Sequence, residues 1–249
     1  MGVRIQLCGR VCVEIGGERR EPKLPGPQGR RLFAYLTVRR FDLLTRPDLA
    51  AAVWGEHPPG SPEPALSALL SRLRAALAPV PLDGLRLVLP QAAWVDLEAA
   101  RDAIHRAESA AAQCDWGRAW GASQITLFTA RRGFLPGDDL SWIAGVRREL
   151  ESLHVRALEA YAEASLNVAG TELASAERSA RELVVRAPFR ESGYRLLMAA
   201  LAARGNTAEA LRVYDGLVRL LDTELGVVPS QPTRDLHAWL LMTGPARER

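Results

Sequence analysis

Lysine is almost absent from this chain of 249 residues, since Lys23 is the only lysine among 32 basic residues. Arginine therefore supplies nearly all of the positive charge, and together with the abundant alanine this composition is typical of a GC-rich genome. The number of arginines alone is then no sign of phosphate binding. Their distribution says more, because residues 1–96 carry a net charge of +4 and residues 97–249 a net charge of −1. The N-terminal segment is the part that favours an anionic partner.

Long apolar runs are also absent. No stretch approaches the roughly 20 apolar residues that a membrane span needs. The opening residues, MGVRIQLCGRVCVEI, lack the apolar core and the cleavage site of a secretory signal. The sequence thus predicts a cytoplasmic protein without a membrane partner.

Cysteine and histidine are too few and too scattered to predict a metal site. Cys8, Cys12 and Cys114 form an odd set without companions at metal-ligand spacing, and the four histidines are far apart in the chain. We expect the three thiols to be buried, reduced and inert.

Sequence motifs of catalysis are missing as well. The chain has no glycine-rich phosphate loop, no dinucleotide-binding fingerprint, no zinc-protease motif and no nucleophile elbow. The adjacent carboxylates Asp138 and Asp139 follow a Pro-Gly turn, a position that favours capping of the next helix. The sequence therefore predicts neither an enzyme nor a cofactor.

Residues 1–96 combine strand patterns with helical ones. The patterns predict short strands within residues 3–24, helices over residues 29–40, 46–54 and 65–77, a loop over residues 57–62, and a strand over residues 85–89 that pairs with the run around residues 94–95. Gly16-Gly17 favours a hairpin turn, because both residues can take positive φ. The order of sheet, three helices and hairpin is that of a winged helix-turn-helix domain, an α+β fold.

The most informative segment is the third of these helices, ALSALLSRLRAAL. Its five leucines from Leu66 to Leu77 recur at spacings of one, three and four residues, which places them on one face of a helix. The remaining surface combines small side chains with flanking arginines: Ser67, Ala68, Ser71, Arg72 and Arg74. Such a helix fits closely into the major groove of DNA, where a guanidinium binds guanine O6 and N7 together. The alternative is that both arginines are ordinary solvated charges.

Four further arginines stand where this fold favours contact with phosphates or with a groove. Arg30, Arg31 and Arg46 are near the N-termini of helices, whose free backbone N–H groups also attract phosphate. Arg86 lies in the expected wing, which can enter the minor groove. These arginines complete the predicted interface for double-stranded DNA.

Residues 97–249 are almost wholly helical in pattern, so the chain as a whole is expected to be mainly α. Helices are expected over residues 97–112, 116–128, 142–168, 173–187, 191–204, 207–221 and 232–241. Ala176 and Ala210 are 34 residues apart, the period of a tetratricopeptide helix pair. This spacing predicts a tetratricopeptide-like all-α domain, with a generic helical bundle as the alternative. No motif gives a role to residues 107–120.

Several motifs occur in the order found in one known family. They are Gly29-Arg30-Arg31-Leu32, Val53-Trp54-Gly55 before a proline-rich loop, Ser71-Arg72-Leu73-Arg74, Ala187-Pro188-Phe189-Arg190-Glu191, Ala208-Glu209-Ala210-Leu211 and Glu224-Leu225-Gly226-Val227. In this order they resemble the actinobacterial antibiotic regulatory proteins (SARP) of AfsR, DnrI and RedD type. That family joins an OmpR-like winged helix to a bacterial transcriptional activator domain. The resemblance covers nearly the whole chain and implies these two domains over residues 1–96 and 97–249.

The resemblance implies a sequence-specific transcriptional activator that controls a biosynthetic gene cluster. Such proteins bind promoter direct repeats as homodimers or side-by-side protomers, and they contact RNA polymerase, including its sigma factor. A nucleoid-associated location follows. The resemblance makes Arg72 the first choice for contact with a base and Arg74 the second, with phosphate as its partner; Ser67 and Ser71 follow.

The loop between the second and third expected helices corresponds to the transactivation loop of OmpR-type proteins. The correspondence makes Glu56, His57, Gly60 and Ser61 the expected contacts with polymerase. Two features depart from the family. The run from Leu85 to Leu89 lacks the Gly-Tyr pair usual in the wing, and the chain ends at Arg249 without the ATPase or phosphopeptide-binding regions of larger relatives, so no nucleotide switch is expected.

Two other functions are compatible with the sequence. A winged domain that has lost DNA binding would leave a helical protein-interaction module, which the modest net charge and the altered wing allow. A repressor would use the same DNA site, because activation and repression differ in the position of the operator.

Overall fold

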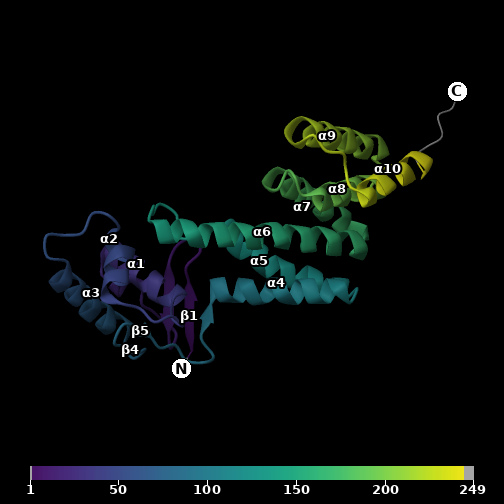
Figure 1. The fold of residues 1–249 in the computed structure, drawn as a ribbon. Helices are drawn as coiled ribbons and strands as arrows, with labels where there is room; N and C mark the ends of the chain where they lie inside the picture. The colour runs from purple at the N-terminus through teal and green to yellow at the C-terminus, as the bar shows by residue number, and fades with distance from the viewer. Residues whose placement is uncertain (1, 244–249) are drawn as a thin grey trace. The chain divides into compact units, whose positions relative to one another are not determined.

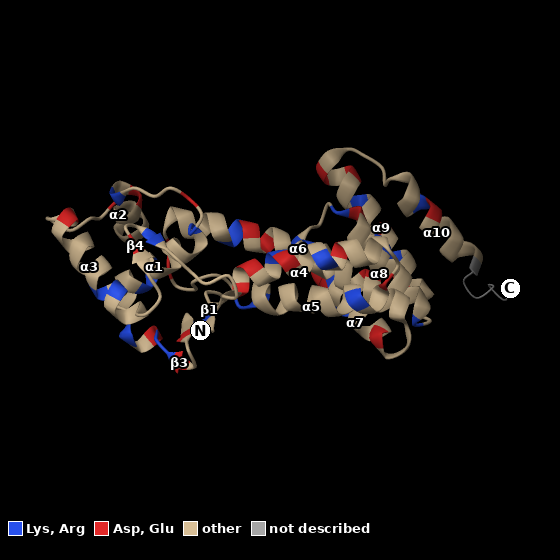
Figure 2. Ribbon diagram, turned by 90° about the horizontal axis from the view of Figure 1, so that it is seen from below, with Lys and Arg blue, Asp and Glu red and all other residues tan. Residues whose placement is uncertain are grey.

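The computed structural model describes residues 2–243, which are mainly helical with a small N-terminal sheet, as the sequence predicts (Figure 1). Contacts divide the chain into two compact units, and charged residues of both signs are scattered over each (Figure 2). Unit 1 comprises Met1–Ala99 and Thr129–Leu150, and unit 2 comprises Ala100–Phe128 and Glu151–Arg249. Unit 1 thus takes in a segment beyond the boundary expected at residue 96. None of the described helices combines the length and the apolar character required to cross a bilayer.

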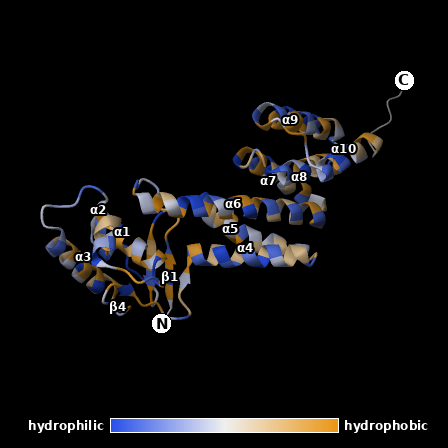
Figure 3. Cartoon of the chain, in the orientation of Figure 1, coloured by the Kyte–Doolittle hydropathy of each residue, from blue (hydrophilic) through white to orange (hydrophobic). Residues whose placement is uncertain are grey.

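Unit 1 contains a four-stranded sheet in the order β3-β2-β1-β6. The strands β1 (Val3–Gln6), β2 (Cys12–Ile15) and β3 (Glu18–Arg19) are antiparallel, and Gly16 and Gly17 connect the last two at positive φ. Alternate residues of β1 and β2 are buried, which gives the sheet one covered face. Hydrophobic and hydrophilic colours both occur in the strands around β1 in Figure 3, as this alternation requires. The expected N-terminal strands and their glycine turn are confirmed.

The pairing expected for residues 85–89 is wrong. The strand β6 (Trp94–Val95) runs parallel to β1, with Arg4 opposite Trp94, whereas β5 (Arg86–Leu87) forms a separate hairpin with β4 (Leu82–Asp83). The reason is local. Gly84 has a φ of 57° and occupies the first position of the tight turn between β4 and β5, a position that favours glycine.

Three helices of unit 1 lie between the N-terminal strands and this hairpin: α1 (Gly26–Val38), α2 (Arg46–Trp54) and α3 (Pro62–Leu77), with the short 3-10 helix η1 (Glu21–Lys23) before them. Helix α1 begins earlier than expected because Pro27 fits the first turn of a helix, where a missing N–H costs nothing. Helix α2 begins at Arg46 as expected. Thr45 and Asp48 form a capping box there, and the hydrogen bonds from Thr45 lower the pKa of Asp48.

A buried carboxylate holds the end of β1. Asp96, the first residue of α4 (Asp96–Ala112), is fully buried, and its oxygens accept hydrogen bonds from the N–H groups of Leu7 and Cys8 at 3.0 and 2.9 Å. Burial raises the pKa of Asp96, although these hydrogen bonds and the charge of Arg132 oppose the shift. Cys8 also forms a β-bridge with Phe134. The carboxylate therefore lies where the sheet, the start of α4 and the segment Thr129–Leu150 meet.

The described part of unit 2 is helical. It contains most of α4 and α5 (Trp116–Arg131), the later part of α6 (Ser141–Val168), the short η2 (Gly170–Glu172), α7 (Leu173–Arg186), α8 (Glu191–Ala203), α9 (Thr207–Leu225) and α10 (Gln231–Thr243). Every helix expected from the sequence is present, with ends shifted by a few residues. Ala176 and Ala210, the two positions of the expected repeat, are both buried.

Cys8 is buried and Cys12 is partly buried, but Cys114 is exposed in the turn after α4, so the expectation of three buried thiols is wrong for Cys114.

Glu191 connects α8 to the first turn of α10. Its carboxylate accepts hydrogen bonds from the Ser230 N–H at 2.9 Å, the Ser230 hydroxyl at 2.7 Å and the Thr233 hydroxyl at 2.6 Å. Burial alone raises the pKa of Glu191, but the hydrogen bonds from Thr233 and Ser230 outweigh burial, so that the pKa is lowered. The ionised side chain therefore caps the start of α10.

We expect Asp96→Asn to lower the free energy of unfolding by about 1–3 kcal/mol. The amide NH₂ group faces one of the two backbone N–H donors and leaves it without an acceptor. Chemical denaturation measures the change. The matched control is Asp102→Asn, which alters an exposed carboxylate of the same helix and should change stability by less than about 0.5 kcal/mol. Equal losses in the two variants would contradict the role of Asp96.

The lowered pKa of Glu191 predicts a loss of stability in acid. A group with a lowered folded-state pKa contributes stability above its unfolded value of 4.5, and this contribution disappears as the pH falls through the folded value. Glu191→Gln removes the contribution. The difference in Tm between the natural chain and this variant should therefore be largest at neutral pH and should shrink in acid. A difference that is independent of pH would refute this. The control Glu224→Gln alters an exposed carboxylate of α9 and should leave the Tm at neutral pH nearly unchanged.

Candidate nucleic-acid interface

Helix α3 exposes the side that the sequence predicts to contact DNA. Its leucines are buried as expected, at Leu66, Leu69, Leu70, Leu73 and Leu77. The residues of the other side are all exposed: Ser67, Ala68, Ser71, Arg72 and Arg74. Each buried leucine contributes about 1.5–3 kcal/mol, so the leucine face fixes the rotation of the helix about its own axis. In Figure 2 the basic residues of α3 lie toward its C-terminal end, and an acidic residue marks its start.

Three predicted residues from two helices surround one hollow of about 340 Å³. Arg46 comes from the start of α2, Ser67 and Arg74 come from α3, and Gly84 of the β4–β5 turn completes the wall. The Arg46 Nη2 donates a hydrogen bond to the Ser67 hydroxyl at 2.7 Å. The Arg74 Nη2 donates to the Gly84 carbonyl at 2.9 Å. The fold thus brings two guanidinium groups and a hydroxyl together from segments that are separate in the sequence.

Arg46 has an acidic partner that the sequence does not predict. Glu63, in the first turn of α3, accepts a hydrogen bond from the Arg46 Nε at 2.6 Å, and the two side chains are 37% and 66% exposed. An exposed ion pair of this kind contributes about 0–1 kcal/mol, so a phosphate can take the place of Glu63 at little cost. Acidic residues are common in the first turn of a helix because they interact favourably with the helix dipole. The pairing of Glu63 with Arg46 depends on the tertiary fold.

Arg72 and Arg86 keep most of their hydrogen-bond donors free of protein partners. In the part of the chain that the structure describes, the side chain of Arg72 makes one long contact, from its Nε to the Ala68 carbonyl at 3.4 Å. The Nε of Arg86, on the hairpin, donates to the Arg40 carbonyl at 3.2 Å. Both side chains are exposed. Each can therefore offer a guanidinium edge to a ligand.

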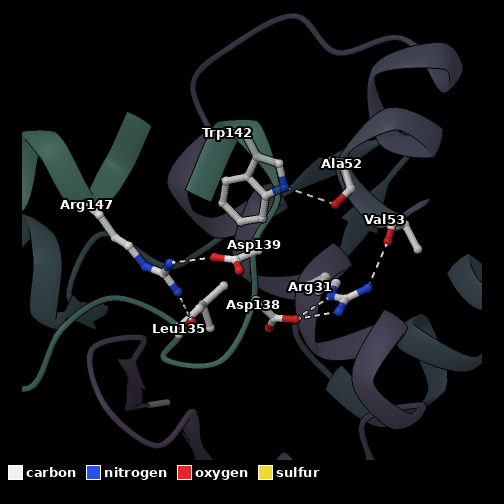
Figure 4. A network of polar contacts seen from close by, with 8 residues as sticks. All are labelled: Arg31, Ala52, Val53, Leu135, Asp138, Asp139, Trp142 and Arg147. Carbon is white, nitrogen blue, oxygen red and sulfur yellow. Dashed lines mark hydrogen bonds and ion pairs between the residues drawn. The ribbon is translucent and has the colours of Figure 1, made fainter. Parts of the chain in front are cut away.

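Arg31 is occupied by a contact within unit 1. Its Nε donates to the Asp138 Oδ1 at 2.6 Å, and its Nη1 lies 3.4 Å from the Val53 carbonyl (Figure 4). Asp138 therefore holds α1. The first hydrogen bonds of α6 are accepted by the backbone carbonyl of Leu140. Arg30 is exposed on α1 and lines a different hollow. Neither Arg30 nor Arg31 is among the residues around the hollow of Arg46 and Arg74.

The segment that carries Asp138 is fixed by two further contacts. The indole N–H of Trp142 donates to the Ala52 carbonyl at 3.0 Å, and the Arg147 Nη2 donates to the Leu135 carbonyl at 2.6 Å (Figure 4). The Trp142 ring also packs edge-on against Tyr35 of α1, with the ring centres 5.1 Å apart. This side of α1 and α2 is therefore a packed surface, whereas the side chains around α3 are open to solvent.

The loop between α2 and α3 lies between two fixed ends. Gly55 has a φ of 58°, and a Cβ added there would come within 2.9 Å of the Leu140 side chain, so glycine is required. Pro62 begins α3. Between these ends the chain runs clear of the helices (Figure 1). The loop residues predicted to contact polymerase are all exposed: Glu56, His57, Gly60 and Ser61. Among residues 2–243, no three His, Cys, Asp or Glu side chains gather as metal ligands do.

Known proteins resemble this chain over nearly its whole length. The family model described as bacterial transcriptional activator domain matches residues 95–241. Two proteins named Regulatory protein AfsR are similar in sequence: that of Streptomyces griseus is 32% identical over 223 residues, and that of Streptomyces coelicolor is 33% identical over 224 residues. These matches cover 86% and 88% of this chain but 22% of each relative. The chain therefore spans about a fifth of the length of the curated relatives it matches.

A solved structure shares the fold. Mycobacterium tuberculosis EmbR, in complex with a low affinity phosphopeptide, matches with a TM-score of 0.77 and 23% sequence identity. The match covers 98% of this chain and 66% of that chain. At this level of identity the similarity concerns the path of the backbone.

Proposed function

We propose that this chain, which belongs to the SARP-type transcriptional regulators with a bacterial transcriptional activator domain, activates transcription by binding promoter DNA through α3. Membership of the family makes it a transcriptional regulator. The use of direct repeats, the contact with RNA polymerase and the control of a biosynthetic gene cluster are the further parts of our proposal.

The observation that carries the proposal is the exposed side of α3 above its buried leucines. Small side chains at Ser67, Ala68 and Ser71 allow close approach to a major groove. Arg72 is exposed and nearly free of protein contacts, which suits a bidentate contact with guanine. Arg46 and Arg74 border the hollow between α2, α3 and the β4–β5 turn, and they suit the phosphates that fix the position of the helix.

Each unit has a part in this proposal. In unit 1, α2 and α3 form the helix-turn-helix and the β4–β5 hairpin is the wing, from which Arg86 reaches toward a neighbouring minor groove. In unit 2, the tetratricopeptide-like arrangement of α7 to α10 serves contacts between side-by-side protomers and with polymerase. The loop residues Glu56, His57, Gly60 and Ser61 face the sigma factor.

We expect Arg72→Ala to weaken binding to the operator by about 1–3 kcal/mol and to relax the preference at one base pair. Genome-wide footprinting first identifies the operator, and fluorescence anisotropy then compares the operator with single-base variants. The matched control is Arg106→Ala, because Arg106 is an exposed arginine of α4, outside the proposed contact regions, and its loss removes the same charge. The control should retain the affinity and the base preference.

Two results would count against the DNA interface. Unchanged affinity and selectivity in Arg72→Ala would exclude Arg72 as a base contact. If the natural chain bound no promoter fragment even at low salt, where phosphate contacts are strongest, a protein-interaction module would be favoured.

The loop makes a separate prediction. Replacing Glu56, His57 and Ser61 by alanine should leave operator affinity unchanged and abolish activation in transcription with purified polymerase, because the three side chains are exposed outside the proposed DNA-contacting residues. The control replaces the exposed Asp102 and His105 of α4, which lie outside both proposed contact regions, by alanine. Full activation by the loop variant would exclude this contact, and reduced transcription with the natural chain would identify a repressor.

A further inference from the structure

A second hollow of unit 1 has the size of a small-molecule site and is lined by both apolar and charged side chains. Its volume is about 660 Å³, and it lies where the β1–β2 turn, η1, the start of α1 and residues 135–138 meet. Three buried apolar side chains form its base: Val11, Leu24 and Leu135. Three exposed prolines surround them: Pro22, Pro27 and Pro136. Small-molecule sites typically measure about 300–1,000 Å³ and are mainly apolar with a few polar groups.

Among the residues that the structure describes, only the acidic side chains around this second hollow have partners of opposite charge. Its two carboxylates have arginine partners, since Glu21 pairs with Arg19 and Asp138 pairs with Arg31. Its two arginines, Arg10 and Arg30, are exposed. Over the described range 2–243, neither of these two guanidinium groups takes part in a hydrogen bond or an ion pair. The charge left without a partner at this hollow is therefore positive.

We propose that the second hollow binds a small amphiphilic carboxylate, a molecule with an apolar body and one anionic end. The body packs on Val11, Leu24 and Leu135, and the carboxylate lies between Arg10 and Arg30. A guanidinium binds a carboxylate through two parallel hydrogen bonds, which gives both strength and direction. The apolar base offers nothing to the hydrophilic backbone of a nucleic acid, so a DNA phosphate is the poorer fit for these two arginines.

Such a ligand would touch the segment that supports the helix-turn-helix. Leu135, Pro136 and Asp138 line the hollow, and Asp138 also binds Arg31 of α1. Occupancy would therefore stabilise residues 135–138 in the position that holds α1. The binding itself does not depend on the proposed contact with DNA.

Isothermal titration calorimetry on the full chain tests the proposal with phenylbutyrate as the probe and its uncharged amide as the comparison. We expect saturable binding of phenylbutyrate to one site and at least tenfold weaker binding of the amide. The double variant Arg10→Gln, Arg30→Gln should also bind phenylbutyrate at least tenfold more weakly. The control Arg212→Gln, Arg219→Gln removes two exposed arginines of α9 and should bind like the natural chain.

Several results would overturn the proposal. They are the absence of saturable heat with the natural chain, equal affinity for the acid and the amide, and unchanged affinity in the Arg10, Arg30 variant. Thermal melting confirms that this variant is folded. Operator affinity is measured separately, because the sequence predicts a phosphate contact for Arg30. A loss of operator affinity with unchanged binding of phenylbutyrate would show that the two arginines bind the duplex instead. The heat of phenylbutyrate binding is read without DNA, so it stands whether or not the proposed function holds.

Discussion

The arrangement of unit 1 depends on the buried carboxylate of Asp96. Where β1 leaves the sheet, the N–H groups of Leu7 and Cys8 are inside the protein, and buried N–H groups without partners are costly. Asp96 accepts a hydrogen bond from each. Directly after this point, Cys8 and Gly9 pair with Phe134 and Gly133, so the segment that carries Asp138 is brought beside the strand. The contacts that support α1 thus start from Asp96, which is not one of the residues of the proposed DNA interface.

The fold sorts its arginines into two groups. Arg31 with Asp138 and Arg40 with Glu98 hold parts of unit 1 together, and the second pair is bidentate, with both distances at 2.8 Å. Arg72 has one long contact with a carbonyl of its own helix. Arginine content and proximity to a helix end do not separate these groups. The position of the acidic side chains in the fold does. A guanidinium with a half-buried carboxylate partner offers less to an external anion, whereas the exposed pair of Arg46 and Glu63 can open at little cost.

The sequence predicted the helices well because their signals are local. The leucine spacing in α3, Pro47 at the start of α2 and the glycine turn after β2 each act within a few residues. The partner of β6 was predicted wrongly, because a strand of two residues carries no signal for the strand it joins across the fold. The exposed side of α3 followed from the leucine pattern. The contacts of Arg46 with Glu63 and of Arg31 with Asp138 depend on tertiary packing, and no spacing in the sequence indicates them.

The loop between α2 and α3 has a consequence for the evolution of such proteins. Gly55 and Pro62 fix the two ends of the loop. Gly55 does so by a positive φ that disfavours a side chain, and Pro62 by a ring suited to a first helical turn. The residues between them are largely exposed and bury little of the core. Their composition and length can therefore change without disturbing the helices on either side. The loop can therefore change during evolution to fit different partners, while the leucine core of the same fold stays constant.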